Sequence, residues 1–257
     1  MSLVLPQSVN YKESLPTLPE GTQQINVGAS PINGQTFKSG DQIMIDFLNR
    51  GFLIPDSIYM SYKIALTLGD AAHTPQMKGC PVYTPFNRLD LQLGSQTVDS
   101  INNYNIIMNM LSNLTMSVSE KYGMQTALGY SPDGTLTTVP SLEQLDGRQF
   151  TNAIKVANFS GPLMSLLTNS EKLIPLFAMP QVRLILSLDS IANMFIAGAG
   201  QIVLPTGYEI TNFELRYKIV DMGGNVEEIV RGMGEKIFIK SQSFGSATQL
   251  LSPTTGL

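Results

Sequence analysis

Apolar and polar side chains alternate along several stretches of this chain, and the clearest stretch is residues 173–189, LIPLFAMPQVRLILSLD. A proline-bounded apolar turn leads directly into the alternating part. One side of that part carries Val182, Leu184, Leu186 and Leu188, and the other carries Arg183, Ile185, Ser187 and Asp189. A period of two residues is typical of a β-strand with one buried face and one solvated face. We therefore predict a half-buried strand at this position.

The same alternation predicts further strands along the chain. These strands are expected at 24–29, 40–48, 57–68, 87–98, 152–158, 208–221 and 236–244. In 87–98 we expect Leu89, Leu91 and Leu93 to face inward and Arg88, Asp90 and Gln92 to face outward. About eight strands separated by turn signals, with few helices, favour an all-β fold. The predicted fold is an antiparallel jelly-roll sandwich with one or two short helices and a long inserted loop.

Two helices and three irregular segments complete the pattern. Tyr104, Ile107, Met108, Leu111 and Leu114 recur at helical spacing after a capping residue, Asn102 or Asn103. A short acidic helix is predicted over 226–232, because Glu227 and Glu228 near its start suit the helix dipole. Polar and Gly/Pro-rich stretches predict a surface loop at 69–85, a long loop at 116–149 and a short helix or turn at 159–170.

We divide the chain into three parts. Residues 1–21 contain Pro6, Pro16 and Pro19 and no periodicity, which favours an extended N-terminal arm. Such an arm is either a disordered tail or a segment that orders against a neighbour, and the sequence leaves both open. Residues 22–222 form the predicted jelly-roll domain. Residues 223–257 hold a short helix and a strand, as a linker or as the start of a second jelly roll.

The composition indicates a surface that is covered by other chains. The chain has 257 residues, of which 43% are hydrophobic and 14% are charged. A charged fraction of about a quarter is usual, and a free monomer needs surface charge for solubility. The net charge is −4 and Lys and Arg form no cluster, so we expect no direct binding to nucleic acid. Residues 1–20 lack the pattern of a signal peptide, and no apolar run is long enough to span a bilayer.

Candidate chemistry is sparse. The single histidine, His73, and the single cysteine, Cys80, lie in the Gly/Pro-rich loop. The carboxylates of Asp41, Asp46, Asp90 and Asp99 are spread over separate strands, and Glu143 and Asp146 are expected to be solvated in the long loop. A Ca²⁺ site between subunits stays open as an alternative. Gly198–Gly200 and Gly223-Gly224 lack the spacing of a phosphate loop and are interpreted as turns. We therefore predict no catalytic, cofactor-binding or metal-binding residues and no enzyme activity.

One region resembles a known family. LIPLFAMPQVRLILSLDSI, ELRYKIVDMGGNVEEIVRG and IFIKSQSF follow one another over about seventy residues. Their order resembles the double-jelly-roll major capsid proteins of virophages, polinton-like viruses and large DNA viruses, specifically the first jelly roll and the start of the second. The resemblance implies a structural subunit of an icosahedral viral capsid, made inside the host cell and located in the virion. It also implies homotrimers of pseudo-hexagonal outline, with penton or cement proteins as further partners.

One departure from the family leaves alternatives open. A full double jelly roll needs far more than 257 residues. The chain is therefore a fragment or split form, a single-jelly-roll relative, or a subunit whose last strand pairs with a neighbour. A different function class also stays open, a receptor- or carbohydrate-binding β-sandwich of a virion or cell surface. The absence of Trp disfavours carbohydrate binding, and a single histidine disfavours a cupin-type enzyme.

Overall fold

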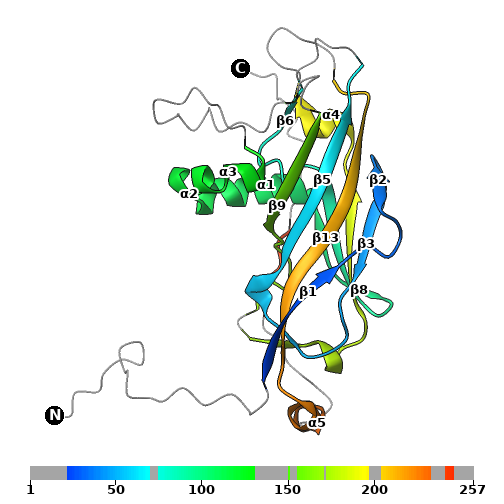
Figure 1. Cartoon of the computed structure of the whole chain (residues 1–257), viewed down its shortest axis with the longest axis vertical. Helices are drawn as coiled ribbons and strands as arrows, with labels where there is room; N and C mark the ends of the chain where they lie inside the picture. The colour runs from blue at the N-terminus through cyan, green and yellow to red at the C-terminus, as the bar shows by residue number, and fades with distance from the viewer. Residues whose placement is uncertain are drawn as a thin grey trace, which may run out of the picture.

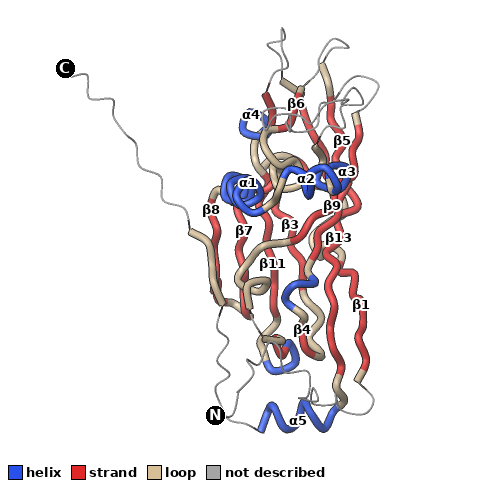
Figure 2. Tube along the Cα trace, turned by 90° about the vertical axis from the view of Figure 1, so that its left-hand side faces the viewer, coloured by secondary structure: helices blue, strands red, loops and turns tan. Residues whose placement is uncertain are grey.

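The computed structural model describes residues 22–69, 75–130, 150, 155–170, 172–196, 204–232 and 241–245. Two antiparallel sheets face each other along the long axis of the molecule (Figures 1 and 2). Eight principal strands build them. In chain order these are β1 (Gln23–Ala29), β3 (Gln42–Asp46), β5 (Tyr59–Thr67), β7 (Phe86–Leu93), β8 (Gln96–Asn102), β9 (Val156–Pro162), β11 (Val182–Leu188) and β13 (Gly207–Asp221).

The pairing of these strands is nested. The first pairs with the last, the second with the seventh, the third with the sixth, and the fourth with the fifth, all antiparallel. Further pairs, β13 with β5 and β11 with β7, complete the two sheets. The orders are therefore β1-β13-β5-β9 and β3-β11-β7-β8. An antiparallel hairpin of strands wrapped into two facing sheets is the jelly-roll topology. The predicted fold is confirmed.

Short elements extend and close this framework. The strands among them are β2 (Thr36–Lys38), β4 (Phe52–Leu53), β6 (Gln76–Met77), β10 (Ile174–Pro175) and β12 (Phe195–Ile196). The helices are α1 (Tyr104–Thr115), α2 (Val118–Gly123), α3 (Gln125–Leu128), α4 (Ile191–Met194) and α5 (Gly224–Gly232), with two 3-10 turns, η2 (Pro55–Ser57) and η4 (Leu176–Ala178). Figure 2 shows α1, α2 and α3 in a row between β8 and β9.

The register explains why the strand β11 was so clear in the sequence. Leu184 lies opposite Ile45 on one side and Leu91 on the other, and Leu186 lies opposite Ile43 and Leu89. These side chains all point between the sheets and are at most 1% exposed. The predicted inward set of β11 is confirmed. The opposite face is less exposed to solvent than predicted, because Ile185 is only 8% exposed.

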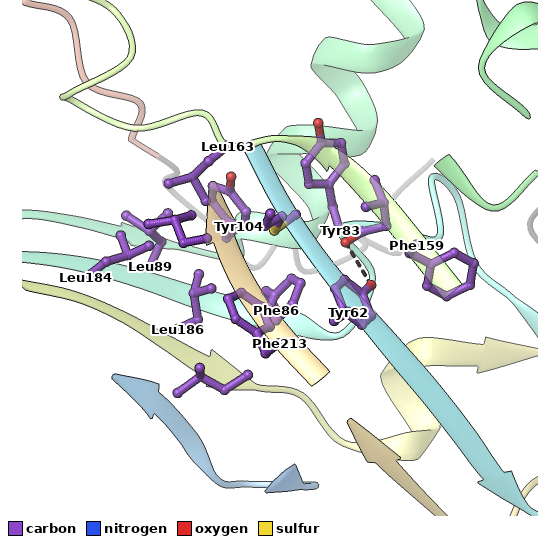
Figure 3. Close-up of a cluster of buried hydrophobic side chains, with 14 of the residues drawn as sticks. Tyr62, Tyr83, Phe86, Leu89, Tyr104, Phe159, Leu163, Leu184, Leu186 and Phe213 are labelled. Carbon is purple, nitrogen blue, oxygen red and sulfur yellow. Dashed lines mark hydrogen bonds between the residues drawn. The ribbon is translucent and has the colours of Figure 1, made fainter. Parts of the chain in front are cut away.

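Aromatic side chains fill the middle of the sandwich (Figure 3). Tyr62 lies edge-on to Phe86 and Phe159, with ring centroids 5.4 and 5.6 Å apart, and stacks on Phe213 at 6.0 Å. Its hydroxyl donates to the carbonyl of Val82 at 2.9 Å, which satisfies the polar end of the buried ring. Residues from both sheets and from the loop before β7 therefore share one core.

Burial raises the pKa of the core tyrosines, Tyr62, Tyr83, Tyr104, Tyr130, Tyr208 and Tyr217. In the unfolded chain a tyrosine ionises near pH 10. Above that pH the unfolded state loses these protons more readily than the folded state, so stability falls as the pH rises. We expect phenolate absorbance to increase in one cooperative step together with the loss of β-sheet circular dichroism, above about pH 10. Independent titration of these tyrosines in a protein that stays folded would contradict their burial.

The structure corrects several predicted segments. The stretch 87–98 is not one strand, because a turn at Gly94, with φ +60°, divides it into β7 and β8. The predicted strand at 152–158 lies later, as β9. It continues through Gly161-Pro162, where we placed a turn, because a proline is tolerated at the end of an edge strand. The long loop is also partly helical, since α2 and α3 occupy its start.

The segment 69–85 is not simply a surface loop. Cys80, Val82 and Tyr83 are at most 4% exposed and close one end of the sandwich. The other predictions have mixed outcomes. The helices at 104–114 and 226–232 are confirmed as α1 and α5. The arm 1–21 and most of the predicted strand 236–244 lie outside the described residues, and residues 241–245 have no regular secondary structure.

Candidate interaction surfaces

The four aspartates that we considered for chemistry lie apart, and each has its own partner. Asp46 accepts two hydrogen bonds from Arg183 on the neighbouring strand, at 2.6 and 3.0 Å. Asp90 accepts from Arg88 at 2.8 Å, and Asp41 accepts from the backbone N–H of Lys38, the last residue of β2, at 2.7 Å. Asp99 accepts from the hydroxyl of Ser243. The described residues contain no group of three or more His, Cys, Asp or Glu that could hold a metal ion.

The other candidate residues are buried, form a turn or lie outside the described residues. Cys80 is 1% exposed, and burial raises the pKa of its thiol, which disfavours the reactive thiolate. Gly223 has a φ of +84°, and its carbonyl accepts the first backbone hydrogen bonds of α5, so it serves the turn before that helix. His73, the pair Glu143 and Asp146, and Gly198–Gly200 lie outside the described residues.

A polar centre that we did not predict lies at Asp189, directly after β11. We placed this side chain on the wet face of the strand, but it is 5% exposed. One carboxylate oxygen accepts from the Ser190 N–H at 2.7 Å and from Asn193 at 2.8 Å, and the other accepts from Asn105 at 2.9 Å. Asp189 thereby ties the start of α1 to α4 beside a hollow of about 400 Å³. The alternating pattern could not reveal this, because it shows neither the approach of the distant Asn105 nor the turn that brings Ser190 and Asn193 to the carboxylate.

An exposed apolar ridge runs along the outer side of α1. Ile106, Met110 and Leu114 are spaced four residues apart and are 57%, 57% and 78% exposed. Side chains at this spacing lie in a row on one helix face. The inner face holds Tyr104 and Met108, which are at most 1% exposed, so the helix is apolar on two sides. Leu114, which belongs to the apolar periodicity that predicted this helix, lies on the exposed side. An apolar row in solvent is typical of a contact with another chain.

A second exposed surface lies where β1 borders the long strand β13. A hollow of about 780 Å³ is lined by polar side chains of both strands and by Tyr59, which is 47% exposed. Within it, Glu214 pairs with Arg216 at 2.7 Å. The Glu214 carboxylate lies over Gly28 in the space that a Cβ atom at residue 28 would fill. Gly28 therefore allows this carboxylate to lie close to the margin of the sheet.

None of the helices within the described ranges is long and apolar enough to cross a membrane. Together, these observations leave exposed surfaces for contact with other molecules.

Comparison with known proteins identifies the fold. Neither a protein-family model nor a curated protein matches the sequence. Among solved structures, the Faustovirus major capsid protein matches with a TM-score of 0.55 and 8% identity, over 91% of this chain and 58% of that chain. VP54 of PBCV-1, in a structure fitted into a reconstruction of the virophage Sputnik, matches with a TM-score of 0.52 and 14% identity, over 87% of this chain and 48% of that chain.

The PBCV-1 capsid gives a similar result, with a TM-score of 0.51 and 14% identity, over 86% of this chain and 47% of that chain. This chain therefore spans about half the length of the capsid proteins that it matches. Because the identities are low, the likeness concerns the fold. The nested jelly roll of this chain is a fold that it shares with part of these viral capsid proteins.

Proposed function

We propose that this chain is a structural subunit of an icosahedral viral capsid, located in the virion and assembled inside the host cell. The observation that carries the proposal is the nested strand order, which matches capsid proteins over 86–91% of this chain. The subunit acts by burying surface against copies of itself. It makes no direct contact with nucleic acid, which fits the net charge of −4 and the scattered Lys and Arg residues.

The proposed assembly unit is a homotrimer of pseudo-hexagonal outline. This expectation comes from the resemblance to double jelly rolls, in which two barrels in each subunit give six similar positions around a trimer. A chain that spans about half of its structural relatives corresponds to one of the two barrels, so three copies of it supply three of these six positions. Penton or cement proteins are further partners in this proposal, and the arm 1–21 contacts a neighbouring copy.

The apolar ridge on α1 supports a contact with another chain. A stable interface needs a well-packed apolar centre, in which a few large side chains supply most of the binding energy. Ile106, Met110 and Leu114 provide such side chains on a rigid helix. Methionine suits contacts between copies in slightly different environments, because its unbranched side chain adapts its shape.

The mass of the purified full chain tests the proposed function. Light scattering or native mass spectrometry should find trimers or shells. A protein that stays monomeric at every concentration tested and binds a glycan array would contradict the proposal and favour the receptor- or carbohydrate-binding alternative.

A ridge variant tests the contact on α1. Leu114→Glu is expected to weaken self-association about tenfold or more, because it places a charge in an apolar contact, and about 1.4 kcal/mol corresponds to tenfold. Stability should change little, since the side chain is 78% exposed. Ile229→Glu is the matched control, because Ile229 on α5 is 59% exposed but lies far from α1 (Figure 1). Analytical ultracentrifugation measures both, and equal effects would contradict a contact specific to the ridge.

A further inference from the structure

Two sheets have four edge strands. The outer side of an edge strand, here called its margin, presents unpaired backbone N–H and C=O groups to any other strand when nothing covers it. The described residues cover three of these margins. Along β3, the backbone N–H of Ile32 donates to Met44 at 2.8 Å. The side chain of Asn33 donates to the carbonyl of Gln42 at 2.6 Å and accepts from Met44 at 3.0 Å. A loop thus occupies the outer side of β3.

The margins at β9 and β8 are also protected. Helix α3 packs beside β9, where Leu128 contacts Gly161, and β9 ends in Pro162. Strand β8 carries an inward-pointing charge, Asp99, which is 9% exposed and accepts from Ser243. Inward charges, prolines and covering segments are the devices by which natural sheets prevent unwanted pairing.

Strand β1 has none of these devices among the described residues. Its sequence, QQINVGA, contains no charge and no proline. It pairs with β13 without a bulge from Gln23 to Ala29, and no other described strand pairs with it. Figure 2 shows β1 as the outermost strand of its sheet. The neighbouring strand β2, which also lies beside β13, carries Lys38 in an ion pair with Glu209 at 3.2 Å. The unprotected part of this margin is therefore β1.

The side chains of β1 are incompletely covered. Ile25, Val27 and Ala29 point toward the core but are only partly buried, whereas Gln24, Asn26 and Gly28 are exposed on the other face. A further strand beside β1 would cover the apolar side chains and pair the outer backbone groups. The strand that fits must therefore alternate in the same way and carry no repelling charge.

We propose that the outer margin of β1 pairs antiparallel with β1 of a second copy of this chain, about a two-fold axis at Asn26. This pairing deepens the proposed capsid role and rests on it. In this register Ile25 of each copy lies opposite Val27 of the other, so the apolar faces match. Asn26 lies opposite Asn26, and their amides can hydrogen-bond as a cross-strand pair.

The same register gives Gly28 a role. Gln24 of one copy lies opposite Gly28 of the other, where the Glu214 carboxylate lies over the glycine. The amide N–H groups of Gln24 are thus placed beside a carboxylate acceptor of the other copy. The pairing joins two sheets into one across the two-fold axis and adds no like-charge contact within β1.

Disulfide trapping tests the register in the full chain. Opposed residues of antiparallel strands have Cα atoms about 4.5–5.5 Å apart, which is within disulfide reach. Asn26→Cys is therefore expected to give a covalent dimer on mild oxidation. Gln24→Cys is the matched control, because the two copies of residue 24 are offset by four residues, roughly 13 Å. The buried Cys80 should not crosslink in the unchanged chain.

The outcomes separate this inference from the proposed function. Efficient crosslinking at residue 26 with little at residue 24 supports the pairing. If the protein associates but neither variant crosslinks, or both do so equally, the pairing is wrong and the capsid role stands. If no form of the protein associates at any concentration, both proposals fail.

A charge pair tests the same contact without a disulfide. Asn26→Lys places like charges opposite each other and is expected to reduce the two-fold contact about tenfold, and Asn26→Asp should do the same. An equimolar mixture of the two variants should restore the contact. Thr97→Lys, on the exposed side of β8, is the control and should leave association unchanged. Failure of the mixture to recover would overturn the proposed register.

Discussion

Replacing Gly129 with alanine is expected to lower the free energy of unfolding by about 2–5 kcal/mol, which combines backbone strain and overpacking. Gly129 follows α3 with a φ of +86°, a conformation that side-chain-bearing residues rarely adopt. An added Cβ would also lie 2.6 Å from Cδ1 of the Phe159 ring and 2.9 Å from Cβ of Pro81. Phe159 packs on Tyr62 at the centre of the core, so it cannot move away without disturbing other rings (Figure 3).

Gly40→Ala is the matched control for this change. Gly40 has almost the same backbone conformation, with a φ of +85°, but nothing lies within 4 Å of its added Cβ. Gly40→Ala is therefore expected to lower the free energy of unfolding by the backbone strain alone, about 1–2 kcal/mol. Chemical denaturation of the two variants separates the effect of backbone strain from the effect of overpacking against Phe159. Equal losses of stability would mean that the contact with Phe159 is looser than the structure indicates.

Replacing Asp189 with alanine is expected to cost about 2–4 kcal/mol, because donors that face a buried carboxylate lose their acceptor. The carboxylate accepts from Ser190 and Asn193, which lie at the start of α4 and within it, and from Asn105 in α1. Without this carboxylate, Asn105 of α1 and Asn193 of α4 lose the acceptor that they share. The adjacent hollow of about 400 Å³ lets water reach some of these donors, which keeps the cost below that of a fully enclosed site.

Asp41→Ala provides the comparison, since Asp41 is exposed and accepts one hydrogen bond from the Lys38 N–H. It should cost about 0.5–1.5 kcal/mol, the usual value for a single hydrogen bond. Thermal or denaturant unfolding measures both variants. Hydrogen exchange should also show faster opening at the start of α1 only in the Asp189 variant. A stability loss no larger than that of Asp41→Ala would contradict the role of Asp189 as a shared anchor.

The alternation of apolar and polar residues predicted the sandwich, because a strand that buries one face needs apolar side chains at every second position. In β5 the inward residues alternate with polar, small or aromatic ones, and in β11 they alternate with Arg183, Ile185 and Ser187. The structure buries the inward residues Leu184, Leu186, Tyr62 and Ile64 accordingly. The strand count indicated a sandwich or a jelly roll, and the resemblance to capsid proteins indicated the jelly roll, which the structure confirms. Periodicity could not locate the turn at Gly94, because the alternation of β7 runs close to the start of β8 and apolar residues occur on both sides of the turn.

The positions of the candidate surfaces depended on tertiary structure far more than the positions of the strands did. Both faces of α1 are apolar, so the sequence could not tell which of them meets the sheet. The fold buries Tyr104 and Met108 and leaves Leu114 in solvent. The open margin of β1 was equally hidden, since a strand becomes marginal only through its place in the sheet order. The alternation of its strand predicted that Asp189 is solvated, but the nearby Ser190 and Asn193 and the distant Asn105 donate to it in a buried position.

The sequence by itself therefore determined what burial controls locally, namely the positions of strands such as β5, β11 and β13, the side of β5 and β11 that faces the core, and the low content of charged residues. Only the tertiary structure decided which strands lie at the margins, which helix face stays exposed and which polar groups find partners. The physical reason is the range of the forces involved. Alternation records the environment of each residue along its own strand, whereas sheet order and hydrogen-bond partners depend on segments far away in the chain.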